Sequence, residues 1–319
     1  MNKQLSGQKK ILLLSLCALL ILCLYLTVNL QGGSSYIIHR RWIKIWTMGL
    51  TSLAIGLSTL LFQTITQNRI LTPSIIGLDS LYGLLQTLLL YFFGSLALMS
   101  ISPENKFMLT VLLMVGFALV LYQLLFKENR FGIYFLLLVG LILGAFFSSI
   151  STFLQVLIDP NEFLFIQDKT FASINNVNQE LLKLSSILIL ANTIWLAFLF
   201  RNLDILALGR SHAINLGINY TRVVRQLLII IAIYVSISTA LIGPIVFFGL
   251  LAINITYQLM NTYRHLLLAL GVFLVGFIAL ALCQLIIEHV LNFSTALSVV
   301  LNLIGGSYFI YLLLKGTQS

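Results

Sequence analysis

Long apolar runs, separated by short polar segments, dominate this sequence. A bilayer core of about 30 Å is crossed by about 20 helical residues, and lipid cannot hydrogen-bond to open backbone, so each run is expected to be a transmembrane helix. A polar segment at 159–183 is expected to add a short surface helix. The pattern predicts an all-α, polytopic membrane protein whose single domain, 1–319, contains about ten transmembrane helices. They are predicted at 11–30, 45–64, 76–99, 107–126, 131–158, 184–200, 224–242, 246–261, 266–287 and 295–314.

The polar segment 201–225 has a pattern of its own, typical of two short helices. Asn202 is a candidate cap for the first helix, which Gly209 would end, and Ser211 and Gly217 would do the same for the second. A compact folded segment between two spans is typical of a surface that binds another protein. A plain connecting loop is the alternative.

The composition excludes a protein that faces water on all sides. Of the 319 residues, 60% are hydrophobic and 8% are charged, and the mean hydropathy is +1.05. A soluble domain has about a quarter of its residues charged. The lipid bilayer is therefore expected to cover most of the surface.

The net charge of +9 is explained by topology. With both termini in the cytoplasm, the inner connections contain 12 of the 18 Lys and Arg residues, while most acidic residues fall outside. This is the bias that the positive-inside rule describes for a multi-pass membrane protein. No nucleic-acid partner is needed to account for the basic character.

The chain lacks the usual signatures of catalysis and of cofactor binding. It has no glycine-rich phosphate loop ending in Gly-Lys-Ser/Thr, and Glu288-His289 lacks the second histidine of a helical zinc site. Asp79 is the acid closest to membrane depth, and its place beside Gly77 favours the lipid–water interface. We expect no catalytic residue, cofactor or metal. An integral membrane enzyme acting on lipids is the alternative function.

Uncharged polar residues within the spans favour a helical pathway through the membrane. An amide without a partner is costly in lipid, so these residues either line a path or bridge neighbouring helices. For each one taken singly, a bridging role is the simpler interpretation. The residues are Gln63, Gln86, Asn192, Asn254, Gln284 and Asn302.

Seven motifs occur in the same order as in a known family. They are Arg41–Lys44, Gln63, Asn68–Pro73, Phe171–Ile174, Leu208–Ile218, Gly243–Leu250 and Ile304–Phe309. Over nearly its whole length the chain resembles the permease subunits of ATP-driven importers (type II ABC importers) for iron–siderophore complexes, haem and cobalamin. These subunits have ten spans each, and the resemblance implies that this chain lies in the bacterial cell membrane.

The chain also departs from the family pattern. Ile253-Asn254 replaces a Pro-His pair and Tyr257 replaces the arginine that follows it, while Arg69 replaces the first proline of Asn-Pro-Leu-Ala-Asp-Pro. Ser294–Ser298 replaces Glu-x-Pro-x-Gly. These departures indicate a divergent branch, of the kind in which two different permeases pair to import catecholate or related siderophores.

The resemblance implies a set of partners. Separate ATP-binding subunits would hydrolyse ATP, a second permease subunit of different sequence would complete the pathway, and an extracytoplasmic siderophore-binding protein would deliver the substrate. The segment Leu203–Asn219 would contact the ATPase, with apolar side chains in a cleft, glycines ending the short helices and an arginine at the rim. These residues would be Leu206, Gly209, Arg210, Ala213, Leu216 and Gly217.

Two further sites follow from the resemblance. Arg41 and Lys44 fall on an arginine pair that receives glutamates of the binding protein, whereas Glu288 lies near where the family has another basic residue. Interfacial anchoring beside Trp42 is the alternative for this basic cluster. Gly243–Gly249 is expected to form a tight reversal that holds the eighth span against its neighbours, and a moving gate is the alternative.

Overall fold

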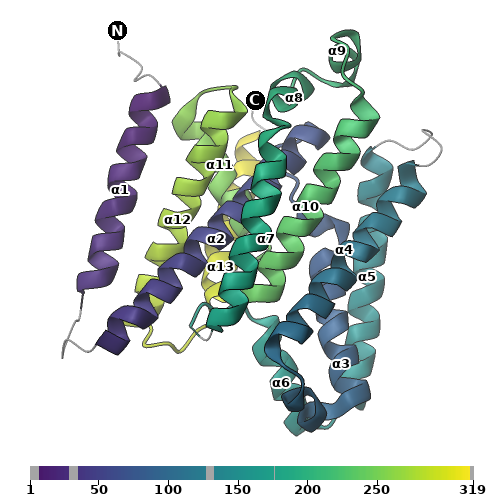
Figure 1. Ribbon diagram of the computed structural model, residues 1–319, viewed down its shortest axis with the longest axis vertical. Helices are drawn as coiled ribbons and strands as arrows, with labels where there is room; N and C mark the ends of the chain where they lie inside the picture. The colour runs from purple at the N-terminus through teal and green to yellow at the C-terminus, as the bar shows by residue number, and fades with distance from the viewer. Residues whose placement is uncertain (1–6, 29–34, 127–132, 176, 317–319) are drawn as a thin grey trace.

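The computed structural model describes residues 7–28, 35–126, 133–175 and 177–316, and this part of the chain forms a bundle of helices without strands (Figure 1). Each helix of 13 or more residues coincides with one predicted span, which confirms the all-α membrane fold. They are α1 (Gly7–Thr27), α2 (Ser35–Thr66), α3 (Leu78–Ser100), α4 (Pro103–Phe126), α5 (Ile133–Leu157), α7 (Gln179–Ala197), α10 (Tyr220–Ile242), α11 (Phe248–Met260), α12 (His265–His289) and α13 (Leu297–Gly316).

Seven of these helices are long and apolar enough to cross a membrane by themselves: α1, α2, α4, α5, α7, α10 and α12. The 13 residues of α11 span about 20 Å, which is less than the hydrocarbon core. Helix α3 is interrupted at Gly94, whose φ of 70° is not helical. The count of ten spans is therefore approximate.

Four short elements connect the long helices. They are η1 (Pro73–Ile76), α6 (Pro160–Thr170), α8 (Phe200–Leu206) and α9 (Arg210–Asn215). Helix α6 is the surface helix that the polar segment 159–183 predicts, and Asp159 caps it by accepting from the backbone N–H of Asn161 at 2.8 Å.

Helix α2 lies at the centre of the bundle, with 78% of its spanning window buried, whereas α1 lies at the periphery with 17% buried. Small and hydroxyl residues on α2 let its neighbours approach closely, which is how helices associate in a membrane. The Ser52 hydroxyl donates to the carbonyl oxygen of Phe273 in α12 at 2.7 Å. Two turns further along α2, a Cβ at Gly249 of α11 would lie 2.1 Å from the Thr59 Oγ1.

One boundary differs clearly from the prediction, since α2 begins at Ser35 and the predicted span at 45. The basic residues Arg40, Arg41 and Lys44 therefore lie within the helix. Hydropathy alone misses these turns because their charges are satisfied by partners distant in sequence.

The two ends of the bundle differ in what they carry (Figure 1). The start of α1, the end of α13 and helices α8 and α9 all lie at one end, called here the α8–α9 end. The start of α2 and helix α6 lie at the opposite end, called the α6 end.

Candidate functional site

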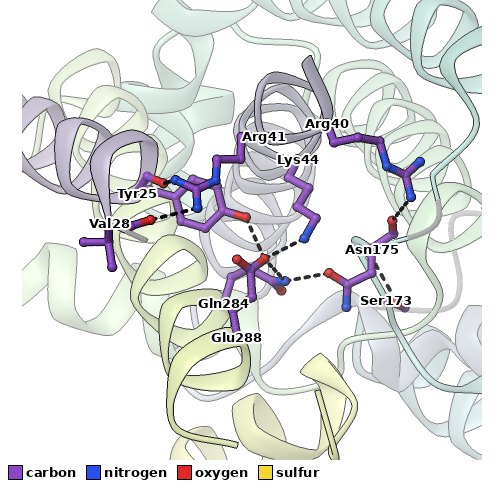
Figure 2. Close-up of polar contacts among 9 residues, drawn as sticks. All are labelled: Tyr25, Val28, Arg40, Arg41, Lys44, Ser173, Asn175, Gln284 and Glu288. Atoms are coloured by element: carbon purple, nitrogen blue, oxygen red, sulfur yellow. Dashed lines mark hydrogen bonds and ion pairs between the residues drawn. The ribbon is translucent and has the colours of Figure 1, made fainter. Parts of the chain in front are cut away.

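Glu288 is the centre of a polar cluster at the α6 end (Figure 2). Its Oε1 accepts from the Lys44 ammonium at 2.6 Å, from the Tyr25 hydroxyl at 2.7 Å and from the Gln284 amide at 2.7 Å. The side chains of Lys44 and Glu288 are only 15% and 9% exposed. Charges this far from water persist when they are paired and hydrogen-bonded, so the two neutralise each other. The Glu288 cluster is Tyr25, Arg41, Lys44, Asn175, Gln284 and Glu288.

Arg41 is buried and fastens the end of α1 to α2. Its Nη1 donates to the carbonyl oxygen of Tyr25 at 2.9 Å, and its Nη2 donates to that of Val28 at 2.7 Å (Figure 2). The Nη1 atom also donates to the carbonyl oxygen of Leu26 at 2.8 Å. The last carbonyls of a helix have no partner within the helix and carry partial negative charge, so a guanidinium suits them.

The structure thus gives each predicted docking residue a partner within the chain: carbonyls for Arg41 and a carboxylate for Lys44. Arg40, next to them, is held less firmly, since its Nη2 reaches the carbonyl oxygen of Asn175 at 3.5 Å. Docking at Arg41 and Lys44 stays a prediction.

Trp42 and Trp46, on the same turns of α2, project their rings outward and are about half exposed. The Trp46 indole N–H donates to the Ser186 hydroxyl of α7 at 2.8 Å. An apolar ring with a satisfied polar atom suits the boundary between lipid and water. Outward tryptophans and inward cations therefore share this part of α2.

At the opposite end, α8 and α9 form the folded segment that the sequence predicts. Gly217, with φ of 82°, ends α9 as predicted, but the other three predicted caps are wrong. No side chain caps either helix; α8 starts after Leu199, and Gly209, with φ of 99°, precedes α9 instead of ending α8. The side chain that caps a helix here belongs to Asn219, at the start of α10. Asn202 and Ser211 fail as caps because the helices begin one or two residues before them.

The apolar side chains of this segment divide into two groups. Leu206 and Ala213 are buried against the chain's own helices, where they fix the shape of the segment. Leu208, Ile214 and Leu216 are 58%, 50% and 60% exposed. A partner that docks here would therefore meet this second group.

Polar side chains fasten α8 to the long helices, in an arrangement that the sequence analysis missed. The Asp204 carboxylate accepts from the backbone N–H of His265 at 2.9 Å and lies 2.7 Å from its Nδ1. The other ring nitrogen of His265 lies 3.0 Å from the Thr64 Oγ1 of α2, and the Gln67 amide donates to the carbonyl oxygen of Leu206 at 3.0 Å. No local pattern could indicate this contact, because 61 residues separate Asp204 from His265.

Asp79, which the sequence places at the lipid–water interface, packs against α10, and its depth in the membrane stays a prediction. It accepts a hydrogen bond of 3.4 Å from Thr239 of α10 and lines a cavity of about 20 Å³ between η1, α2 and α10. That volume holds about one water molecule. Within the described residues, no group of three or more His, Cys, Asp or Glu side chains could hold a metal ion.

The reversal between α10 and α11 matches its prediction in position. Helix α10 ends at Ile242, Gly243 follows with φ of 96°, and α11 starts at Phe248. A Cβ at Gly243 would lie 3.0 Å from the Cα of Ala172, so the segment after α6 packs against this glycine. Whether the reversal also moves as a gate stays untested.

Comparison with known proteins identifies the family. The model of the FecCD transport family matches residues 11–315. The chain belongs to the FecCD transport family. This membership favours a transport permease over a membrane enzyme acting on lipids.

The relatives of the chain include permeases of siderophore import systems. It is 49% identical to the petrobactin import system permease protein YclO of Bacillus subtilis, over 98% of this chain and 99% of the relative. It is 34% identical to the petrobactin import system permease protein FatC of Bacillus anthracis, over 88% and 79% of the two chains, and 29% identical to the petrobactin import system permease protein FatD of the same organism, over 83% and 77%. The fold is similar to that of a metal-chelate-type ABC transporter in an inward-facing conformation, with a TM-score of 0.84, 24% identity and coverage of 97% and 100%.

Proposed function

We propose that this FecCD-family permease is the membrane-spanning subunit of an ATP-driven importer for iron–siderophore complexes of the petrobactin class. The observation that carries the proposal is the 49% identity to a petrobactin permease over 98% of the chain. Identity over that length includes both ends of the bundle, and therefore the surfaces that partner proteins would use.

A second permease of different sequence would form the other half of the pathway. FatC and FatD are both permease proteins of one petrobactin import system, and this chain is more similar to FatC than to FatD. Two unlike relatives within one system support a pair of unlike subunits, of which this chain is the FatC-like member.

The α8–α9 end would face the cytoplasm and the ATP-binding subunits. It carries Arg201, Arg210, Arg222 and Arg225 near the exposed Leu208, Ile214 and Leu216, in keeping with the positive-inside rule. The start of α1 and the end of α13 lie at this end as well, which supports two cytoplasmic termini (Figure 1). Exposed apolar side chains on a segment whose own core is packed suit a cleft in a partner protein.

The α6 end would face outward and receive the siderophore-binding protein. Arg40, Arg41 and Lys44 would supply its positive charge, and Glu288 would limit how much of the Lys44 charge reaches a partner. Exposed charges at such a surface mainly raise the association rate and orient the partners.

The test is transport by the reconstituted complex. The chain is produced with a FatD-like permease, an ATP-binding subunit and a binding protein from the same operon, and placed in liposomes. We expect uptake of ⁵⁵Fe-petrobactin that requires ATP and the binding protein, with little uptake of a ferric hydroxamate. Uptake of the hydroxamate alone would refute the substrate class, and full uptake without the FatD-like chain would refute the unlike pair.

A further inference from the structure

The Glu288 cluster connects the basic face of α2 to a distant connection between helices. Gln284 donates both to Glu288 Oε1 and to the Asn175 Oδ1, each at 2.7 Å (Figure 2). Asn175 lies between α6 and α7, and its carbonyl oxygen is the atom that Arg40 reaches. Two cations of α2 are thus linked to Asn175, Lys44 through Glu288 and Gln284, and Arg40 directly.

The connection that carries Asn175 is packed into the bundle. The backbone N–H of Ser173 donates to the carbonyl oxygen of Ile242, the last residue of α10, at 2.9 Å. The backbone N–H of Ala172 donates to the Ser298 hydroxyl, in the first turn of α13, at 3.1 Å. Ala172 also packs against Gly243, as described above. Residues 171–175 therefore contact the reversal between α10 and α11, the start of α13 and the Glu288 cluster.

The charges of the cluster set up a competition. Glu288 holds Lys44 with one oxygen atom, which also accepts from Tyr25 and Gln284. A carboxylate of a docked protein that approaches Lys44 and Arg40 competes with Glu288 for the first and with the Asn175 carbonyl for the second. If it succeeds, Glu288 keeps only neutral donors, and residues 171–175 lose one contact to α2.

We infer that Glu288 is a positioning residue that sets the strength of docking and links a docked acidic partner to residues 171–175. This inference rests on the proposed function, because the docked partner is the binding protein of the importer. Through the Gln284–Asn175 hydrogen bond, docking would change how firmly the α10–α11 reversal is held. An exchange of ion-pair partners on a packed segment is a local event that can bias a larger movement.

Two variants separate docking from its transmission. Glu288→Gln removes the charge but keeps an acceptor for Tyr25 and Gln284, so Lys44 becomes free to meet the partner. Gln284→Met keeps a side chain of similar length and the Lys44–Glu288 pair, but breaks the link to Asn175. The control is Glu180→Gln, which removes the same charge from an exposed pair with Lys183 at the start of α7, near α2.

The variants are measured as the whole complex in nanodiscs, by the association rate of the binding protein and by the ATPase stimulation that this protein gives at saturation. For Glu288→Gln we expect association about twofold to fivefold faster at low salt, and a difference that disappears at high salt. For Gln284→Met we expect unchanged association and at least half of the stimulation lost. Glu180→Gln should leave the stimulation at the wild-type value.

Full stimulation in Gln284→Met would overturn the inference, as would association in Glu288→Gln that is no faster than in Glu180→Gln. If Gln284→Met does not assemble, Asn175→Ala breaks the same hydrogen bond from the other side, and full stimulation there is equally decisive against it. A wild-type complex that does not bind the binding protein would instead refute the proposed function.

Discussion

Replacing Arg41 is expected to detach the end of α1 from α2. Three hydrogen bonds of 2.7–2.9 Å join its guanidinium to α1 carbonyl oxygens. A hydrogen bond to a charged group contributes about 1.5–3 kcal/mol, and a cation at a helix C-terminus adds about 0.3–1 kcal/mol. These values do not add fully, and water can reach the freed carbonyl at the exposed Val28. We therefore expect Arg41→Met to lose about 3 kcal/mol of stability.

The loss is measured as the melting temperature of the purified complex in detergent. For a chain of 319 residues 1 kcal/mol corresponds to about 1.5 °C, so Arg41→Met should melt about 4–5 °C below the wild type. Arg41→Lys keeps the charge but not the planar fork that reaches three carbonyls. Its melting temperature should therefore lie between those of Arg41→Met and the wild type. Melting of both variants at the wild-type temperature would show that Arg41 does not anchor α1.

Arg40→Met is the matched control, because it removes the neighbouring cation, which has one hydrogen bond of 3.5 Å. We expect it to change stability by less than about 0.5 kcal/mol and to slow association of the binding protein at low salt. The comparison separates anchoring from docking. Arg41→Glu could not do so, since it would place a carboxylate against carbonyl oxygens.

Three further predictions concern coupling and assembly. Leu216→Asp places a charge on the exposed apolar group of the α8–α9 segment and should abolish transport-coupled ATPase activity, whereas Arg210→Ala should reduce this activity much less. Full coupling in Leu216→Asp would refute the docking of this segment. Gly249→Val forces a side chain onto Thr59 and should reduce the amount of assembled complex on size-exclusion chromatography; normal assembly with lost transport would favour the gate. His265→Phe keeps a ring but loses both ring hydrogen bonds, so fewer iron complexes should be imported per ATP hydrolysed, and an unchanged ratio would show that the contact to α8 is only structural.

The positions of most helices could be predicted from the sequence, but the burial and pairing of their charged side chains could not. Long apolar runs predict α10 and α12 well, because the length and hydropathy of a span are properties of a local stretch of chain. The start of α2 was missed since Arg41 and Lys44 look like solvated residues until α1 and α12 are folded beside them. The buried state of Lys44 depends on Glu288, which is 244 residues away.

The α8–α9 segment shows the same limit. Its two short helices and the positive φ of Gly209 and Gly217 were predictable from residue type. Which leucines are exposed was not predictable, because Leu206 and Leu216 are the same residue type and only the helices packed against them differ. Their burial is decided by the packing of α8 and α9 on the long helices.

The departures at Arg69 and Tyr257 gain a meaning only from the structure. In the sequence, Tyr257 of α11 stands where the family has an arginine, and Arg69 stands where the family has a proline. In the structure the Arg69 guanidinium lies 4.8 Å from the centre of the Tyr257 ring, so the cation remains beside position 257. The Gln63 and Asn254 amides donate to the carbonyl oxygen of Arg69 at 2.7 and 3.3 Å and fix its backbone there. A cation beside position 257 thus comes from the segment before η1 instead of from α11, and two amide hydrogen bonds fix the backbone of the residue that carries it.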